Sequence, residues 1–137
     1  MRQKHPIFIA LGIIALIMLG IPGVAAVGLP LELYGSLTVN GAPAPVNTHV
    51  LAYIDGNARG FVDTEVAGRY GGSGDWDQKL LVFGEAGDVG HQVSFWVNVG
   101  GGHWAAQTTP FAQGTTRQLD LTVTYATPTP TPTPTPT

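Results

Sequence analysis

Hydrophobic and polar residues alternate along much of the chain after residue 28. The alternating stretches are residues 31–40, 49–54, 92–99 and 117–125. In the first stretch the regularly spaced apolar residues are Leu31, Leu33, Leu37 and Val39. A period of two places such residues on one face of a β-strand, whereas no window of ten or more residues after residue 28 has helical periodicity. The pattern therefore predicts an all-β domain over residues 28–126.

Shorter strands are expected between these stretches, at residues 59–65, 69–70, 79–83 and 104–109. Gly35 interrupts the first strand, which predicts a bulge or a close backbone approach there. Gly-rich turns separate the segments. Seven or eight short strands in about 99 residues favour an antiparallel two-sheet sandwich of the immunoglobulin-like or prealbumin-like kind.

The N-terminus has the organisation of an export signal. Arg2 and Lys4 precede an uncharged apolar run at residues 7–21, and helix-breaking and small residues follow as far as Ala26. This order predicts a signal peptide over residues 1–26, cleaved after Ala26. Residues 7–28 contain no charge and are also long enough for an uncleaved membrane anchor. Both alternatives predict a secreted or cell-surface domain that meets the membrane only through this segment.

The last eleven residues, 127–137, alternate strictly between Thr and Pro. Proline at every second position removes amide donors and favours polyproline II geometry, so no core can form there. We expect a disordered but extended linker or stalk whose threonines are available for O-glycosylation.

Composition narrows the classes of function. The 137 residues carry a formal net charge of −3 and contain no cysteine. Outside Arg2 and Lys4 there are four basic and nine acidic side chains, which argues against nucleic acid as a partner. The lack of cysteine excludes disulfides, thiolate nucleophiles and Cys-ligated zinc. No cofactor motif is present, and no cofactor is expected.

Several turn motifs resemble those of carboxypeptidase regulatory-like modules. They are GSLTVNGAPAP at residues 35–45, HVLAYIDG at 49–56, GFVDT at 60–64 and GRY at 68–70. The likeness is greatest to versions in archaeal or bacterial surface proteins with Thr/Pro-rich spacers, and it covers the first half of the domain. The resemblance implies a transthyretin-like (Ig-like) sandwich that is a non-catalytic spacer or binding unit.

Candidate chemistry is limited. His49, His91 and His103 have no partner at a metal-ligand spacing in the sequence, so no catalytic residue is assigned and an enzyme is not expected. Asp75 and Asp77 lie in a glycine-rich loop and are weak candidates for part of a calcium site, but an ordinary acidic turn is the favoured interpretation and no metal site is assigned.

Three tryptophans, Trp76, Trp96 and Trp104, are the candidates for carbohydrate binding if their rings are exposed and coplanar; otherwise they seal the core edge. The leading hypothesis is a non-catalytic module with a structural or adhesive role at the envelope. A carbohydrate-binding module is the alternative, and a fibre or coat subunit formed by strand-edge pairing is a minor one. The expected partners are envelope components, including glycans, other surface modules and copies of the same chain.

Overall fold

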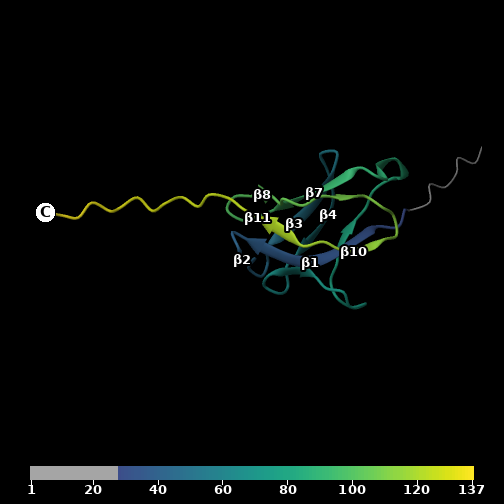
Figure 1. The fold of residues 1–137 in the computed structure, drawn as a ribbon, viewed down its shortest axis with the longest axis horizontal. Helices are drawn as coiled ribbons and strands as arrows, with labels where there is room; N and C mark the ends of the chain where they lie inside the picture. Colours follow the sequence, from purple (N-terminus) through teal and green to yellow (C-terminus); the bar gives the residue numbers. More distant parts are fainter. Residues whose placement is uncertain (1–27) are drawn as a thin grey trace, which may run out of the picture.

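The computed structural model describes residues 28–137, which form an all-β body of two sheets followed by an extended tail (Figure 1). It contains eleven short strands and one 3-10 turn, Ala86–Asp88. The predicted signal segment and its cleavage after Ala26 lie outside the described residues. Within residues 28–137, no helix is long and apolar enough to cross a membrane.

The first sheet is built around β1 (Leu31–Val39). On one side β1 pairs antiparallel with β6 (Leu80–Val82), β5 (Arg69–Gly71) and β2 (Ala42–Pro43). On the other side it pairs parallel with β10 (Thr116–Gln118) and β11 (Leu121–Val123). The parallel pairs differ from the expected fully antiparallel arrangement. No hairpin joins β1 to β10 or β11, and the long connection between them allows the strands to pair in parallel or antiparallel.

The second sheet is antiparallel and has the order β4 (Asn57–Asp63), β3 (His49–Ile54), β7 (Gln92–Val97), β8 (His103–Trp104), with β9 (Thr109–Pro110) also paired to β7. The β3–β4 hairpin turns at Asp55 and Gly56, which have φ values of 49° and 78°. Two positive φ angles are typical of the tight turn that matches strand twist, and Asp-Gly is suited to it. The structure has more strands than expected, because β1 and β7 each pair with several short strands that follow one another along the same edge.

The core lies between the two sheets and confirms the predicted alternation. Seventeen hydrophobic residues are buried, and the alternating positions 31, 33 and 37 of β1, 50, 52 and 54 of β3, and 93, 95 and 97 of β7 are all among them. The sheets also meet at both edges. The Phe83 amide donates to the Arg59 carbonyl at 2.9 Å, and the Ala106 amide donates to the Thr122 carbonyl at 2.9 Å. These bonds give the sandwich a partly closed, barrel-like section.

A bulge at Gly35 confirms the expectation for this position. The β1–β5 register shifts between Gly35 and Ser36. A Cβ at Gly35 would lie 2.4 Å from the Leu119 carbonyl oxygen. The Ser36 amide donates to Asp120 Oδ1 at 3.0 Å, and the Tyr70 hydroxyl donates to the Leu119 carbonyl at 2.6 Å. The bulge thus coincides with the break between β10 and β11.

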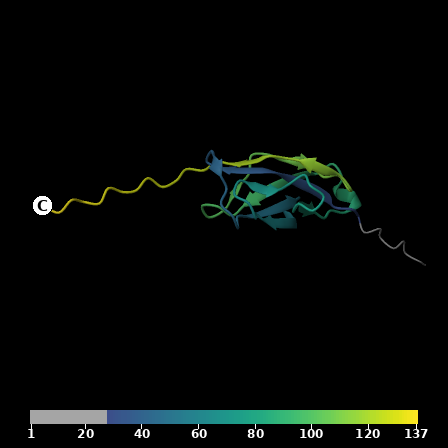
Figure 2. The same ribbon diagram turned by 90° about the horizontal axis from the view of Figure 1, so that it is seen from below.

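The described chain enters and leaves the body at opposite ends (Figures 1 and 2). Residues 126–137 are exposed, form no strand or helix, and lead away from the sandwich in both views. The disorder expected for this tail stays a prediction.

Candidate functional site

Four apolar side chains form a continuous row across the outer face of the second sheet. Phe61 of β4 is paired with Leu51 of β3, Leu51 with Trp96 of β7, and Trp96 with Trp104 of β8. Directly paired residues project from the same face of a sheet, and the neighbours of Leu51 and Trp96 along their strands are buried on the inner face. We call Phe61, Leu51, Trp96 and Trp104 the apolar row.

Both ends of the apolar row are open to solvent. Phe61 is 64% exposed and Trp104 is 52% exposed, whereas the two central side chains are partly buried. An exposed line of large apolar groups on a small domain commonly marks a contact surface. The row is therefore the main candidate binding surface of the described residues.

Ring contacts hold Trp104 in place. Its ring lies 5.0 Å from that of Trp96 and 5.4 Å from that of Tyr53, with interplanar angles of 76° and 73°. Trp96 packs closely over Gly102, where a Cβ would lie 2.3 Å from the indole. The edge-to-face contacts are a favourable aromatic geometry, and they orient Trp104 while half of it remains exposed.

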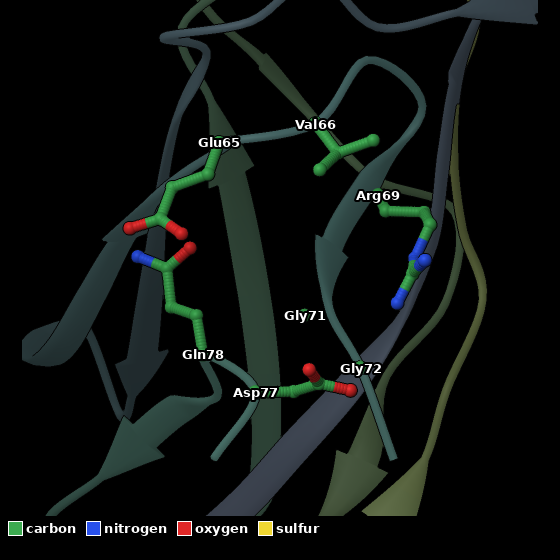
Figure 3. Close-up of a pocket in the computed structure, with 7 residues that line it drawn as sticks. All are labelled: Glu65, Val66, Arg69, Gly71, Gly72, Asp77 and Gln78. Carbon is green, nitrogen blue, oxygen red and sulfur yellow. The ribbon is translucent and has the colours of Figure 1, made fainter. Parts of the chain in front are cut away.

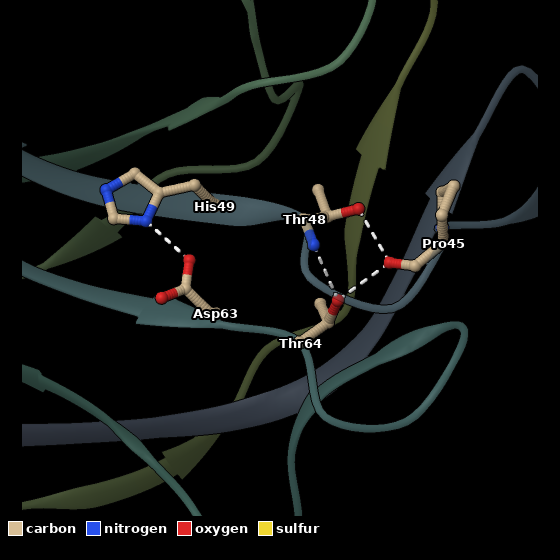
Figure 4. Close-up of polar contacts among 5 residues, drawn as sticks. All are labelled: Pro45, Thr48, His49, Asp63 and Thr64. Carbon is tan, nitrogen blue, oxygen red and sulfur yellow. Dashed lines mark hydrogen bonds and ion pairs between the residues drawn. The ribbon is translucent and has the colours of Figure 1, made fainter.

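Polar side chains border the apolar row along its length. His49 and Tyr53 lie two residues before and after Leu51 on β3, and therefore project from the same outer face. His49 Nδ1 is 2.6 Å from Asp63 Oδ1, its partner on β4 (Figure 4). Ser94 is paired with Tyr53 on the opposite border.

Buried threonines anchor the strand ends that carry His49 and Asp63. The Thr48 amide donates to Thr64 Oγ1 at 2.9 Å, and both threonine hydroxyls donate to the Pro45 carbonyl, at 2.6 and 2.7 Å (Figure 4). This network joins β3, β4 and the preceding loop, so the His49–Asp63 pair sits on a rigid base.

The structure brings two of the three predicted tryptophans together. Trp96 and Trp104 are adjacent, but their 76° angle means that the two rings do not form a coplanar platform. Trp76 is fully exposed and belongs to the loop between β5 and β6, on the other sheet. Phe61 and Leu51, rather than Trp76, complete the apolar row. Their signal in the sequence is a large apolar residue at an outward position of an alternating strand.

The loop that holds the calcium candidates Asp75 and Asp77 also contacts the ammonium group of Lys79. Asp77 Oδ2 accepts the Gly74 amide at 2.8 Å, and Lys79 Nζ donates to the Gly74 carbonyl at 2.7 Å. Asp75 is exposed in this loop. The ammonium group already binds a backbone oxygen of this loop, and its positive charge disfavours a second cation nearby.

A hollow of about 80 Å³ lies beside this loop and is lined in part by Glu65, Arg69, Asp77 and Gln78 (Figure 3). Arg69 and Asp77 face it from different sides (Figure 3). Arg69 also borders a shallower polar groove of about 530 Å³ over β1, β5 and β10. The first hollow is far below the 300–1,000 Å³ usual for ligand pockets, and the second is open rather than enclosed.

The sequence did not reveal a cluster of Asp55, Asp88 and His91, whose potential ligand atoms lie within 4.8 Å of one another. His91 Nδ1 already lies 2.6 Å from Asp55 Oδ2, and Arg59 lies 3.5 Å from Asp88 Oδ2. An arginine at this distance compensates the negative charge that a metal ion would need. The cluster is explained as an ion-pair network that ties the β3–β4 turn to the 3-10 turn.

Comparison of the chain with protein-family models, with curated proteins and with solved structures finds no significant match. The arguments about function therefore rest on the residues and their geometry.

Proposed function

We propose that this chain is an exported, non-catalytic β-sandwich module that is held at the cell envelope and attaches to envelope components through the apolar row. The observation that carries the proposal is the half-exposed Trp104, oriented by two rings and continuous with three further apolar side chains. Aromatic side chains in such settings contribute strongly to binding because they bury a large area at little entropic cost.

The ends of the chain support display outside the cell. In the sequence, the signal segment expected at residues 1–26 precedes the sandwich and the Thr-Pro tail follows it. The tail leaves the body at the end opposite the start of the described chain (Figure 2). An extended tail of this kind acts as a spacer. The resemblance to carboxypeptidase regulatory-like modules of surface proteins is consistent with this role.

Two of the histidines in the described part of the chain are each paired with an aspartate. His49 and His91 each contact an aspartate, and neither ring is hydrogen-bonded to a hydroxyl group within residues 28–137. The nucleophile that a Ser-His-Asp mechanism requires is therefore not joined to these pairs.

Hydrogen bonds between the sheets favour the face over the edges as the contact surface. A strand from another copy needs free backbone groups at a sheet edge. Arg59 on β4 and Thr122 on β11 already accept bonds from the opposite sheet. Fibre formation by strand addition is thus less well supported than binding through the apolar row.

The proposal is tested by sedimentation of the full chain with the insoluble envelope fraction of the producing cells. We expect the parent protein to co-sediment, and Trp104→Ala and Phe61→Ala to lose most of the bound fraction. Trp76→Ala is the matched control, because it removes a fully exposed tryptophan from the other sheet. Failure of the parent to bind, or equal losses in all three variants, would contradict the proposal.

A further inference from the structure

We infer that the ligand of the apolar row is an uncharged, extended glycan that lies along the row, perpendicular to the strands. This inference rests on the proposed function and assigns its partner class. It follows from three properties of the surface: the length of the row, the polar groups on its borders and its charge.

The row offers a narrow apolar strip rather than a pocket. It crosses four strands, from Phe61 on β4 to Trp104 on β8. At about 4.8 Å between neighbouring strands, the three spacings extend over about 14 Å. Because Trp96 and Trp104 meet edge to face, they form no coplanar platform, and the exposed rings of Trp104 and Phe61 at the two ends offer separate contact points. A strip of this length suits a short run of linked sugar rings, whose CH-bearing faces pack on apolar and aromatic side chains. A single small molecule would leave most of it uncovered.

The borders supply the hydrogen-bonding groups that sugar hydroxyls require. His49 and Asp63 lie along one border, and Tyr53 and Ser94 lie along the other. Donors and acceptors on both sides of an apolar strip complement a chain with apolar ring faces and hydroxyl groups along its edges. A purely apolar partner would cover the Tyr53 and Ser94 hydroxyls without offering them a hydrogen bond, which carries a cost.

The charge of the surface selects an uncharged ligand. The four members of the row carry no charge, and the Asp63 carboxylate beside the row is already in contact with His49 Nδ1 at 2.6 Å. Outside Arg2 and Lys4, nine acidic side chains oppose four basic ones, so the domain as a whole repels polyanions. An acidic polysaccharide is therefore disfavoured.

The test is a binding assay of the full chain with insoluble cellulose and chitin as uncharged glycans and cross-linked pectate as an acidic one. We expect binding to at least one uncharged polymer and none to pectate. Trp104→Ala should weaken that binding by about tenfold or more, because a half-buried aromatic anchor is lost. Trp76→Ala should bind as the parent does. Since Trp104 is on the surface, circular dichroism of each variant is expected to match that of the parent.

The outcomes separate this inference from the proposed function. The envelope fraction is treated either with periodate, which oxidises glycans, or with protease. If the parent still binds after periodate but no longer binds after protease, the glycan assignment is overturned and the envelope role stays intact. Absence of binding to every uncharged polymer and to the envelope fraction would overturn both. Binding to pectate that also depends on Trp104 would refute the charge argument alone.

Discussion

At the scale of single residues, Tyr70 joins the core to the bulge at Gly35. Its side chain is fully buried, and its hydroxyl donates to the Leu119 carbonyl at 2.6 Å. Burial raises the pKa of the Tyr70 phenol far above its ordinary value, and the nearby charge of Asp120 raises it further. The Ser36 amide, which donates to Asp120, lowers the pKa of that carboxyl group. Tyr70 and Ser36 thus both bond to the two residues, Leu119 and Asp120, that separate β10 from β11.

Replacing Tyr70 with Phe is expected to lower the free energy of unfolding by about 1–2 kcal/mol at neutral pH, because the partly buried Leu119 carbonyl loses its hydroxyl donor. Denaturant titration measures this loss. Since the folded-state pKa is raised, the stabilisation from the protonated phenol is complete below about pH 10 and is lost as the pH rises above it, at about 1.4 kcal/mol per pH unit. The difference between parent and variant should therefore shrink near pH 11. A constant difference would show that Tyr70 ionises in the folded state as it does in the unfolded state.

At the scale of elements, the contact of β4 with β6 closes one side of the sandwich. Gly60 lies so close to β6 that a Cβ there would be 1.9 Å from the Leu81 carbonyl oxygen. The adjacent bond from the Phe83 amide to the Arg59 carbonyl depends on this approach. Only glycine allows the two backbones to pass at this distance. Since β4 also carries Phe61, the same contact positions one end of the apolar row.

Gly60→Ala is expected to lower the free energy of unfolding by about 2 kcal/mol or more, because the methyl group forces β4 and β6 apart. Gly87→Ala is the matched control, since open space surrounds Gly87, and it should be close to neutral. Thermal melts of the two variants measure the contrast. Equal melting temperatures would contradict the close packing of β4 on β6.

At the scale of the whole molecule, the sandwich and the tail are structurally separate. Residues 127–137 are exposed along their whole length, and no bond between backbone groups joins them to the body. At about 3.1 Å per residue in polyproline II geometry, the eleven residues extend about 34 Å. The tail therefore adds length to the described part of the chain without packing on the sandwich.

Deleting residues 127–137 is expected to leave the melting temperature within about 1 °C of the parent value, because no packed surface is lost. The hydrodynamic radius should decrease. Differential scanning calorimetry and small-angle scattering measure the two quantities. A fall of several degrees would show that the tail docks on the sandwich.

The sequence alone predicted the all-β class, the alternation of β1, β3 and β7, the bulge at Gly35 and the exposed position of the tail. These features depend on local periodicity and on backbone sterics, which neighbouring residues decide. The predicted antiparallel pairing did not extend to β10 and β11, because their partner β1 is more than 75 residues away in the chain.

The apolar row was only partly visible in the sequence, which marked Trp96 and Trp104 but also the separate Trp76. Strand register decided that Phe61, Leu51, Trp96 and Trp104 stand side by side. Register follows from how whole strands align, and a shift by one residue would turn every side chain to the other face. The same long-range alignment brought Asp55 to His91, 36 residues away in the chain. Alternation along the chain thus determined which residues are buried, and tertiary pairing alone decided which exposed residues meet.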